Sequence, residues 1–197
     1  NNTIAMDTAV CNEKTMLLVS AVGIEEEMIS SADRDAKNKL GQFAYLHGFW
    51  KALNTSEQLD LMVQFDSNQA KHIQTRSLVV ANAAPFSTVL AQGDGKPDFH
   101  DGLLNVTWFD ESNTSLENFT DVASLIVAGV SENPAPDSIH TAKVETIKIR
   151  SKNPIGYVID GETFESTEIN IAIKPASLNV LLSKEAIEQT DENGDAK

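Results

Sequence analysis

Segments in which apolar residues alternate with polar ones, or form short continuous runs, recur along most of the chain and predict strands. Residues 3–10 alternate, and residues 15–23 (TMLLVSAVG) form an almost continuous apolar run. The polar pair Asn12-Glu13 lies between these two segments, which are therefore expected to form a hairpin. Further strands are expected at 58–65, 70–81, 103–109, 140–150, 155–160, 168–174 and 177–182.

The expected strand 140–150 alternates in the manner of a two-faced strand. Because successive side chains of a strand point to opposite faces, Val144 is expected on one face. Ile147 and Ile149 are expected on the other face.

Two segments have apolar residues at spacings of three and four, which is typical of helices. One is 40–53, where Ser30 to Asp33 supply N-cap candidates ahead of it, and the other is 115–130. The pattern as a whole predicts a mainly β, α+β domain over residues 1–183, with about two helices and without internal repeats. The polar and acidic tail 184–197 is expected to be disordered.

Composition restricts the classes of protein to which the chain can belong. It has 197 residues and a formal net charge of −14, and this acidity disfavours nucleic acid as a partner. Cys11 is the only cysteine, so no intrachain disulfide can form and a reducing compartment is favoured. No apolar run reaches the length of a membrane span, and the first residues do not resemble a signal peptide.

Five Asn-x-Ser/Thr triplets are typical of a glycosylated surface protein. The alternative is that a chain rich in Asn, Thr and Ser forms such triplets by chance. The absence of paired cysteines and of a signal peptide favours chance. The triplets begin at Asn1, Asn54, Asn105, Asn113 and Asn118.

Asp160-Gly161-Glu162 is the first candidate site. Residues two apart on an extended segment point the same way, so Asp160 and Glu162 can present two carboxylates together. Such a pair can hold a divalent cation, or one member can act as a general base. The alternative is a hairpin turn, because Asp-Gly between strands is a strong hairpin signal.

Residues 96–104 (KPDFHDGLL) are the second candidate site. Asp98 and Asp101 lie in a turn-rich stretch together with several carbonyl groups, and hard cations such as Mg²⁺ and Ca²⁺ accept these oxygens. A solvated turn that enters a strand is the alternative. His100 makes zinc conceivable, but the stretch lacks the cysteines or paired histidines of a zinc site.

Several motifs, in their order along the chain, are similar to a known family. The segment PDFHDGLLNV at 97–106 resembles that family's Pro-x-Ala-x-x-x-Asp-Gly-Leu-Leu-Asp-Val signature, and Asp160-Gly161-Glu162 resembles its Asp-Gly-Glu element. IAMD at 4–7, VGI at 22–24, LGQFAYL at 40–46, SLVVAN at 77–82 and IKPASL at 173–178 follow the same order. The chain thus resembles the C-terminal domain of bacterial lipid kinases of the diacylglycerol kinase catalytic family, relatives of sphingosine kinases and NAD kinases. One departure is segment 83–90, which lacks the consecutive glycines of the family.

The resemblance implies a β-sandwich that normally follows an N-terminal nucleotide-binding domain, which this chain lacks. It implies that Glu162 is the general base and that Asp160 assists it. It also implies a metal site formed by the Asp101 carboxylate with the backbone oxygens of Asp98 and Leu103.

The expected function is that of an ATP-dependent lipid kinase domain that uses Mg²⁺ and phosphorylates a hydroxyl such as that of diacylglycerol. The expected partners are the chain's own N-terminal domain, ATP and a lipid, and the isolated domain is expected to be inactive. A cytoplasmic location with peripheral membrane contact is expected, and homodimer formation is left open. The alternatives are an NAD kinase-like domain, a sphingoid-base kinase domain, a non-enzymatic β-sandwich and a regulatory domain with vestigial carboxylates.

Overall fold

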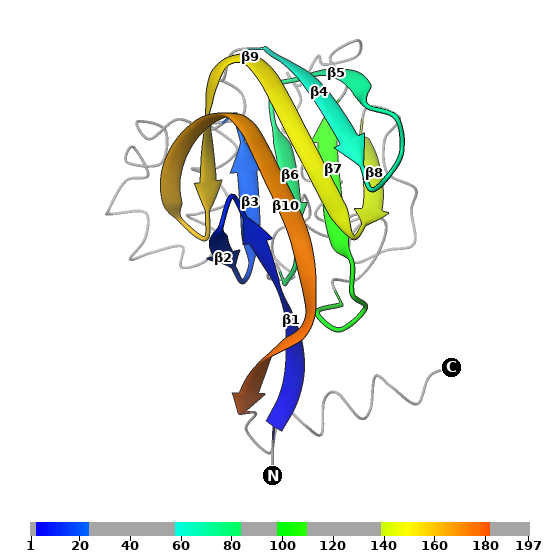
Figure 1. Cartoon of the computed structure of the whole chain (residues 1–197), viewed down its shortest axis with the longest axis vertical. Coiled ribbons are helices and arrows are strands. Elements are labelled where there is room, and N and C mark those ends of the chain that lie inside the picture. The colour runs from blue at the N-terminus through cyan, green and yellow to red at the C-terminus, as the bar shows by residue number, and fades with distance from the viewer. Residues whose placement is uncertain (1–2, 24–57, 84–97, 110–138, 182–197) are drawn as a thin grey trace, which may run out of the picture.

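The computed structural model describes residues 3–23, 58–83, 98–109 and 139–181. The expected helices at 40–53 and 115–130 and the expected disordered tail lie outside these residues. No helix within the described ranges is long and apolar enough to span a bilayer. The described ranges contain ten strands (Figure 1): β1 Thr3–Cys11, β2 Lys14–Met16, β3 Val19–Val22, β4 Leu59–Phe65, β5 Lys71–Thr75, β6 Leu78–Ala81, β7 Leu104–Phe109, β8 Ile139–Val144, β9 Thr146–Ile159 and β10 Glu162–Leu181.

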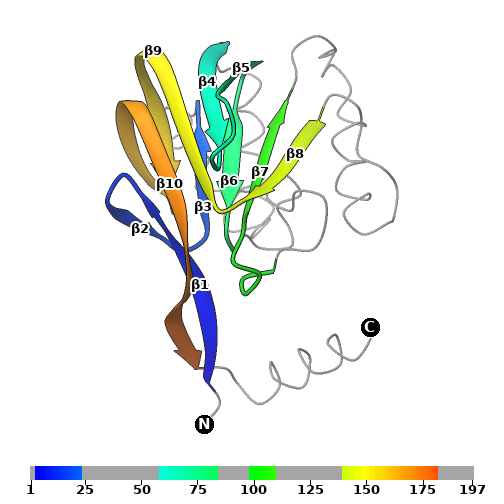
Figure 2. The ribbon, with the colours of Figure 1, turned by 45° about the vertical axis from the view of Figure 1, so that its right-hand side comes forward.

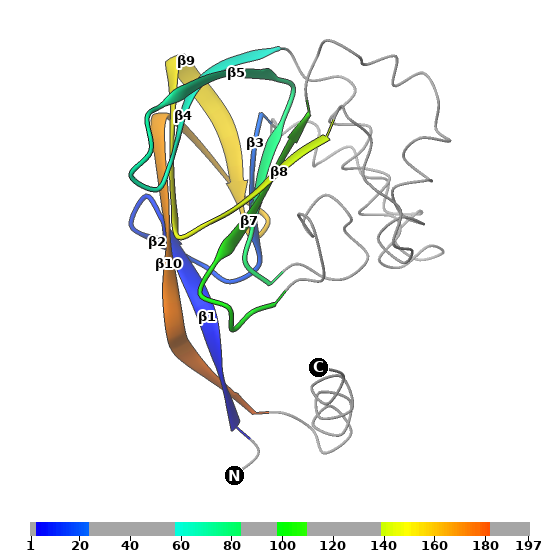
Figure 3. The ribbon, with the colours of Figure 1, turned by 90° about the vertical axis from the view of Figure 1, so that its right-hand side faces the viewer.

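The strands form one hydrogen-bonded sheet that bends over on itself into two layers (Figures 2 and 3). β9 and β10 form a long hairpin that belongs to both layers. The first half of β9 pairs with β4, whereas its last residues pair with β3. One layer thus has the order β2-β1-β10-β9-β4-β5, and the other continues from β9 through β3, β6 and β7 to β8. The mainly β sandwich expected from the sequence is confirmed.

The hairpin changes layer at an irregularity in both of its strands. In β10 the register with β9 shifts between Ser166 and Glu168. In β9 the bend passes through Lys152, Asn153 and Pro154, which are exposed. A bulge bends a strand and increases its local twist, which allows the hairpin to fold over the core.

The core lies between the two layers, and the alternation of the sequence determines which side chains enter it. On β4, Leu61, Val63 and Phe65 are buried, whereas Asp60 and Met62 are exposed. Burying each Leu, Ile, Val or Phe contributes about 1.5–3 kcal/mol relative to leaving it exposed. The largest fully buried side chains are Met16, Leu61, Leu78, Leu104, Ile147, Ile149, Ile169 and Ile171.

Several expected strands have different limits in the structure. Segment 15–23 is broken at residues 17 and 18, and segment 70–81 is broken at residues 76 and 77. At the second break the Thr75 hydroxyl donates to the Ser77 carbonyl at 2.7 Å and accepts from the Ser77 amide at 3.2 Å, so a local turn replaces the ladder. Conversely, the segments 168–174 and 177–182 are both parts of β10.

The expected two-faced strand 140–150 is also interrupted. Glu145 separates β8 from β9, and Val144 is therefore buried together with Ile147 and Ile149 instead of opposite them. Oδ1 of Asp66 accepts from the Glu145 amide at 2.9 Å and from the Thr146 amide at 2.8 Å. Glu145, which belongs to neither strand, shifts the alternation by one position and lets the chain cross between the layers.

The layer that contains β3, β6 and β7 is buried on both faces. Ala21, Val79 and Ala81 pack away from the main core, and all are nearly inaccessible. Asn105 lies on the same layer with 1% of its surface exposed. The triplet at Asn105 therefore cannot carry a glycan in the folded chain, and the other four begin outside the described residues.

Candidate functional site

Asp160 and Gly161 form the two-residue turn between β9 and β10. Ile159 pairs directly with Glu162, and the φ angles are 47° at Asp160 and 96° at Gly161. Two central residues with positive φ define a type I′ turn, the geometry that Asp-Gly favours. The turn interpretation of this motif is therefore confirmed.

The Asp160 carboxylate fastens the loop between β2 and β3. Its Oδ2 accepts from the Leu17 amide at 2.6 Å, and its Oδ1 accepts from the amides of Leu18 and Val19, each at 2.9 Å. The Asp160 amide also donates to the Val19 carbonyl at 3.0 Å. Three N–H donors already face this carboxylate, so its geometry is that of an acceptor that holds a loop rather than that of a proton carrier.

Glu162 differs from Asp160 in its surroundings. It is exposed at the first position of β10, and the structure gives its side chain no polar contact among the described residues. The expectation that the two carboxylates point the same way requires extended backbone, and Asp160 has positive φ. A joint role of Asp160 and Glu162 therefore stays a prediction, with Glu162 as the carboxylate that can reach an external group.

The carboxylates of residues 98–103 stabilise local turns. Asp98 Oδ1 accepts from the His100 amide at 2.9 Å, and Asp101 Oδ1 accepts from the Leu103 amide at 3.0 Å. The ammonium group of Lys143 lies 3.6 Å from Asp101 Oδ2. Within the described ranges there is no group of three or more His, Cys, Asp or Glu residues placed to hold a metal ion.

The predicted metal site at Asp98, Asp101 and Leu103 stays a prediction on these facts. A cation bound there would have to compete with the Lys143 ammonium for Asp101 Oδ2. It would need most of its remaining ligands from backbone carbonyls or water.

Asp7 is a buried carboxylate that joins β1 to this loop and to β10. It is 2% exposed, its Oδ2 accepts from the Gly102 amide at 2.8 Å, and its Oδ1 accepts from the Ala176 amide at 2.7 Å. Its own amide donates to the Phe99 carbonyl at 2.8 Å. A buried charge requires such partners, and Asp7 therefore fixes the position of the 98–103 loop.

Asn82 connects the Asp7 region with the loop that Asp160 holds. Its side-chain Nδ2 donates to the Asp7 carbonyl at 2.8 Å and to the Leu17 carbonyl at 2.9 Å. The Asn82 amide donates to the Leu18 carbonyl at 2.9 Å. The two motifs singled out from the sequence therefore lie in one network of hydrogen bonds.

Sequence reasoning did not identify Asp7 or Asn82 as structural centres, although both belong to segments of the family resemblance. The available signal was a carboxylate in the apolar alternating strand at 3–10, since such a side chain needs partners when the strand is buried. The amides that bind the Asp7 carboxylate are 95 and 169 residues away, and the carbonyls that bind the Asn82 side chain are 75 and 65 residues away.

Comparison with known proteins matches the chain to a described family. Residues 19–182 match the family of the YegS C-terminal NAD kinase beta sandwich-like domain. The uncharacterized protein sll0036 of Synechocystis sp. is 35% identical over 179 residues, which cover 90% of this chain and 41% of that protein. The chain therefore spans less than half of the curated relative.

Solved structures share the fold. Two crystal structures from Bacillus anthracis, the first described as a putative diacylglycerol kinase and the second as a diacylglycerol kinase, align with TM-scores of 0.67 and 0.59 at 16% and 12% identity. Each alignment covers 93% of this chain, and the aligned parts are 59% and 55% of the two solved chains. These structures show the shared fold, and the match over residues 19–182 shows that the chain belongs to the family of the YegS C-terminal NAD kinase beta sandwich-like domain.

Proposed function

We propose that the chain is the substrate-side domain of an ATP-dependent kinase that phosphorylates the hydroxyl group of a lipid such as diacylglycerol. Membership of the family and the fold shared with proteins described as diacylglycerol kinases support this proposal. The chain spans 41% of its curated relative, which leaves room for a further domain. In the proposed enzyme, that domain lies N-terminal to this one and binds the nucleotide.

The observation that carries the proposal is the exposed Glu162 beside a rigid turn. The attacking hydroxyl must lose a proton in phosphoryl transfer, and a positioned carboxylate is suited to accept it. Glu162 is exposed and has no polar contact among the described residues, so it can approach a substrate. Asp160 holds the neighbouring loop through three amides and acts as a positioning residue.

Two exposed apolar side chains beside Asp160 support an apolar substrate. Leu17 and Leu18 are 38% and 41% exposed, and the Asp160 carboxylate binds the amides of both. Exposed leucines at a site suit a partner with an acyl chain. In this proposal, Leu17 and Leu18 contact the chain of the lipid while Glu162 contacts its hydroxyl.

Magnesium-bound ATP is the proposed co-substrate, and the metal neutralises charge on the transferred phosphate. This chain contributes the proton acceptor and the apolar contact, so the isolated domain is expected to lack turnover. Peripheral contact with a membrane follows from a lipid substrate. A cytoplasmic location is proposed because a single cysteine favours a reducing compartment.

The test is a kinase assay on the full-length protein with ATP, Mg²⁺ and diacylglycerol. Glu162→Gln is expected to lower kcat by about 10²–10⁴-fold with little change in KM, because the proton acceptor is lost and binding is retained. Glu165→Gln, on the same strand and also exposed, is the matched control and is expected to keep full activity. Undiminished turnover of Glu162→Gln would contradict the assignment of the base.

A panel of alcohol substrates separates this proposal from its alternatives. Turnover of NAD or of a sphingoid base in place of diacylglycerol would keep the kinase assignment and change the substrate. The absence of turnover with every hydroxyl substrate would reject the kinase in favour of a binding or regulatory domain.

A further inference from the structure

A groove on the outer face of the β2-β1-β10-β9-β4-β5 layer is lined by three strong cations, Lys148, Arg150 and Lys152. It has a volume of about 500 Å³ and lies over β9, β4 and β5. We call it the basic groove and define it by Asp60, Met62, His72, Lys148, Arg150 and Lys152.

Strand geometry brings the three strong cations together. Lys148, Arg150 and Lys152 are two residues apart on β9, and all three line the groove. The whole chain has a net charge of −14, so a row of three cations is unusual for its surface. The carboxylate at the far side of the groove, Asp60, is bonded to the imidazole of His72.

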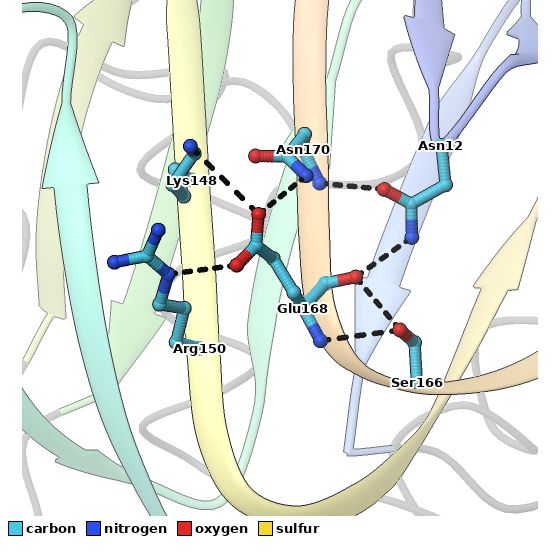
Figure 4. Close-up of polar contacts among 6 residues, drawn as sticks. All are labelled: Asn12, Lys148, Arg150, Ser166, Glu168 and Asn170. Carbon is cyan, nitrogen blue, oxygen red and sulfur yellow. Dashed lines mark hydrogen bonds and ion pairs between the residues drawn. The ribbon is translucent and has the colours of Figure 1, made fainter.

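Glu168 orients Arg150 from the neighbouring strand (Figure 4). Arg150 Nε donates to Glu168 Oε2 at 2.8 Å, and Lys148 Nζ lies 3.8 Å from Glu168 Oε1. Asn170 Nδ2 donates to Glu168 Oε1 at 3.1 Å. The hydrogen bonds from Arg150 and then from Asn170 lower the pKa of Glu168, which therefore stays ionised at neutral pH.

Glu168 is itself anchored through its backbone. Asn12 Nδ2 donates to the Glu168 carbonyl at 2.8 Å, and the Ser166 hydroxyl donates to the same carbonyl at 2.7 Å. The backbone of Glu168, whose carboxylate orients Arg150, is thus held in place at the bulge of β10. This arrangement limits the freedom of Arg150 before any ligand arrives.

The terminal nitrogens of Arg150 have no hydrogen-bond partner among the described residues. Only its Nε bonds to Glu168, and in Figure 4 the two terminal nitrogens point away from that carboxylate. The Lys152 ammonium has no hydrogen bond or ion pair in the part of the chain that the structure describes. A planar guanidinium fork with adjacent ammonium groups is the donor set that suits a phosphate group.

We propose that the basic groove binds a phosphate group, with the terminal nitrogens of Arg150 as its bidentate donor and Lys148 and Lys152 neutralising its charge. Met62, which is 44% exposed and pairs with Arg150 across β4 and β9, lies where an apolar part of the same ligand can rest. The ligand is thus a phosphate compound, either free in solution or a lipid headgroup. The proposal does not depend on the kinase activity, because Glu162 of β10 pairs with Ile159, at the opposite end of β9 from Lys148 and Arg150.

The test measures binding of two probes to the chain of residues 1–197. Inorganic phosphate is titrated by NMR with the backbone amide signals of Met62 and Ser151 in the groove as the reporters, because every variant keeps them. Vesicles of phosphatidylglycerol and vesicles of phosphatidylcholine are compared by co-flotation. Binding of phosphate identifies a site for free phosphate compounds, whereas binding of the phosphatidylglycerol vesicles alone identifies a site for headgroups.

Three variants separate a built site from general charge attraction. Arg150→Gln is expected to weaken binding about tenfold or more, and Arg150→Lys several-fold, because lysine keeps the charge and loses the fork. Lys14→Gln removes the same charge from β2, where the ammonium lies over the Phe164 ring, and is expected to bind as the original chain does. Circular dichroism checks that each variant is folded.

Three results would overturn the proposal. The first is that neither probe binds. The second is that Arg150→Gln binds as well as the original chain. The third is that Lys14→Gln loses as much binding as Arg150→Gln, since this would reduce the effect to net charge.

Discussion

Gly23 and Gly161 share a left-handed backbone and differ in their surroundings. Their φ angles are +90° and +96°, but a Cβ at Gly23 would lie 2.6 Å from Leu59 Cδ1 and 2.7 Å from the Arg76 carbonyl oxygen. A Cβ at Gly161 would meet nothing within 4 Å. We expect Gly161→Ala to lower the free energy of unfolding by about 1–2 kcal/mol, the cost of positive φ alone.

For Gly23→Ala the same backbone cost is joined by the clash, so we expect a total loss of about 2–5 kcal/mol. Urea denaturation of the two variants measures both values. Equal losses would mean that the structure around Gly23 yields to the added methyl group.

At the scale of the residue, the sequence predicted contacts between neighbouring residues and did not predict hydrogen bonds between residues far apart in the chain. The Asp160-Gly161 turn follows from two adjacent residues whose conformational preferences are known. The role of Asp7 depends on amides at Gly102 and Ala176, which are 95 and 169 residues away. No local pattern specifies those partners, because they come together only when the layers form.

At the scale of the element, hydrophobic alternation predicted where most strands lie and failed at their ends. The breaks near residues 17, 76 and 145 all occur where side chains bind backbone amides. Such bonds compete with the hydrogen-bond ladder of the sheet, and the alternation of apolar and polar residues does not predict them. The joining of segments 168–174 and 177–182 into β10 has the converse cause, since the partner strand β1 spans both segments.

The hydrogen bond between Arg150 of β9 and Glu168 of β10 makes the stability of the fold depend on pH. The hydrogen bond from Arg150 lowers the pKa of Glu168 below its ordinary value of 4.5, so the folded state binds this proton less readily than the unfolded chain. The stabilisation is therefore complete above pH 4.5 and is lost as the pH falls through the lowered pKa.

We expect the urea midpoint of Glu168→Gln to fall less between pH 7 and pH 3 than that of the original chain. Glu165→Gln provides the control, because Glu165 is exposed on the same strand. Parallel pH profiles for Glu168→Gln and the original chain would contradict the prediction, because they would mean that the pKa of Glu168 is the same in the folded and unfolded states.

At the scale of the whole molecule, the described residues supply more of the core than of the proposed kinase site. The described strands enclose a core of their own, with the motifs around Asp160 and Asp98 joined through Asn82. The chain nevertheless spans 41% of its curated relative and 59% of a solved chain with the same fold. Composition and periodicity predicted the first property because burial is a local requirement, whereas the site of the proposed kinase would also need residues of a nucleotide-binding domain that this sequence does not contain.

Cys11 can report on the opening of the whole fold. It is fully buried on β1 between Lys14 of β2 and Ile171 of β10, and burial raises the pKa of its thiol from 9.0 to about 11. Only the thiolate reacts, so the raised pKa alone reduces the reactive fraction at pH 8 by about a hundredfold. Since the buried sulfur has no path to a reagent, modification is expected to require unfolding.

We therefore expect Cys11 to react with a disulfide reagent at least about 10³-fold more slowly in the folded chain than in urea. The rate should rise with urea in parallel with the loss of β structure, and Gly23→Ala should raise it in water far more than Gly161→Ala does. Thiol modification measures the reaction rate, and circular dichroism of the same samples measures the remaining β structure. Fast modification of a folded chain would mean that the edge formed by β1 and β2 opens without the rest of the sandwich, because these two strands lie at one end of their layer.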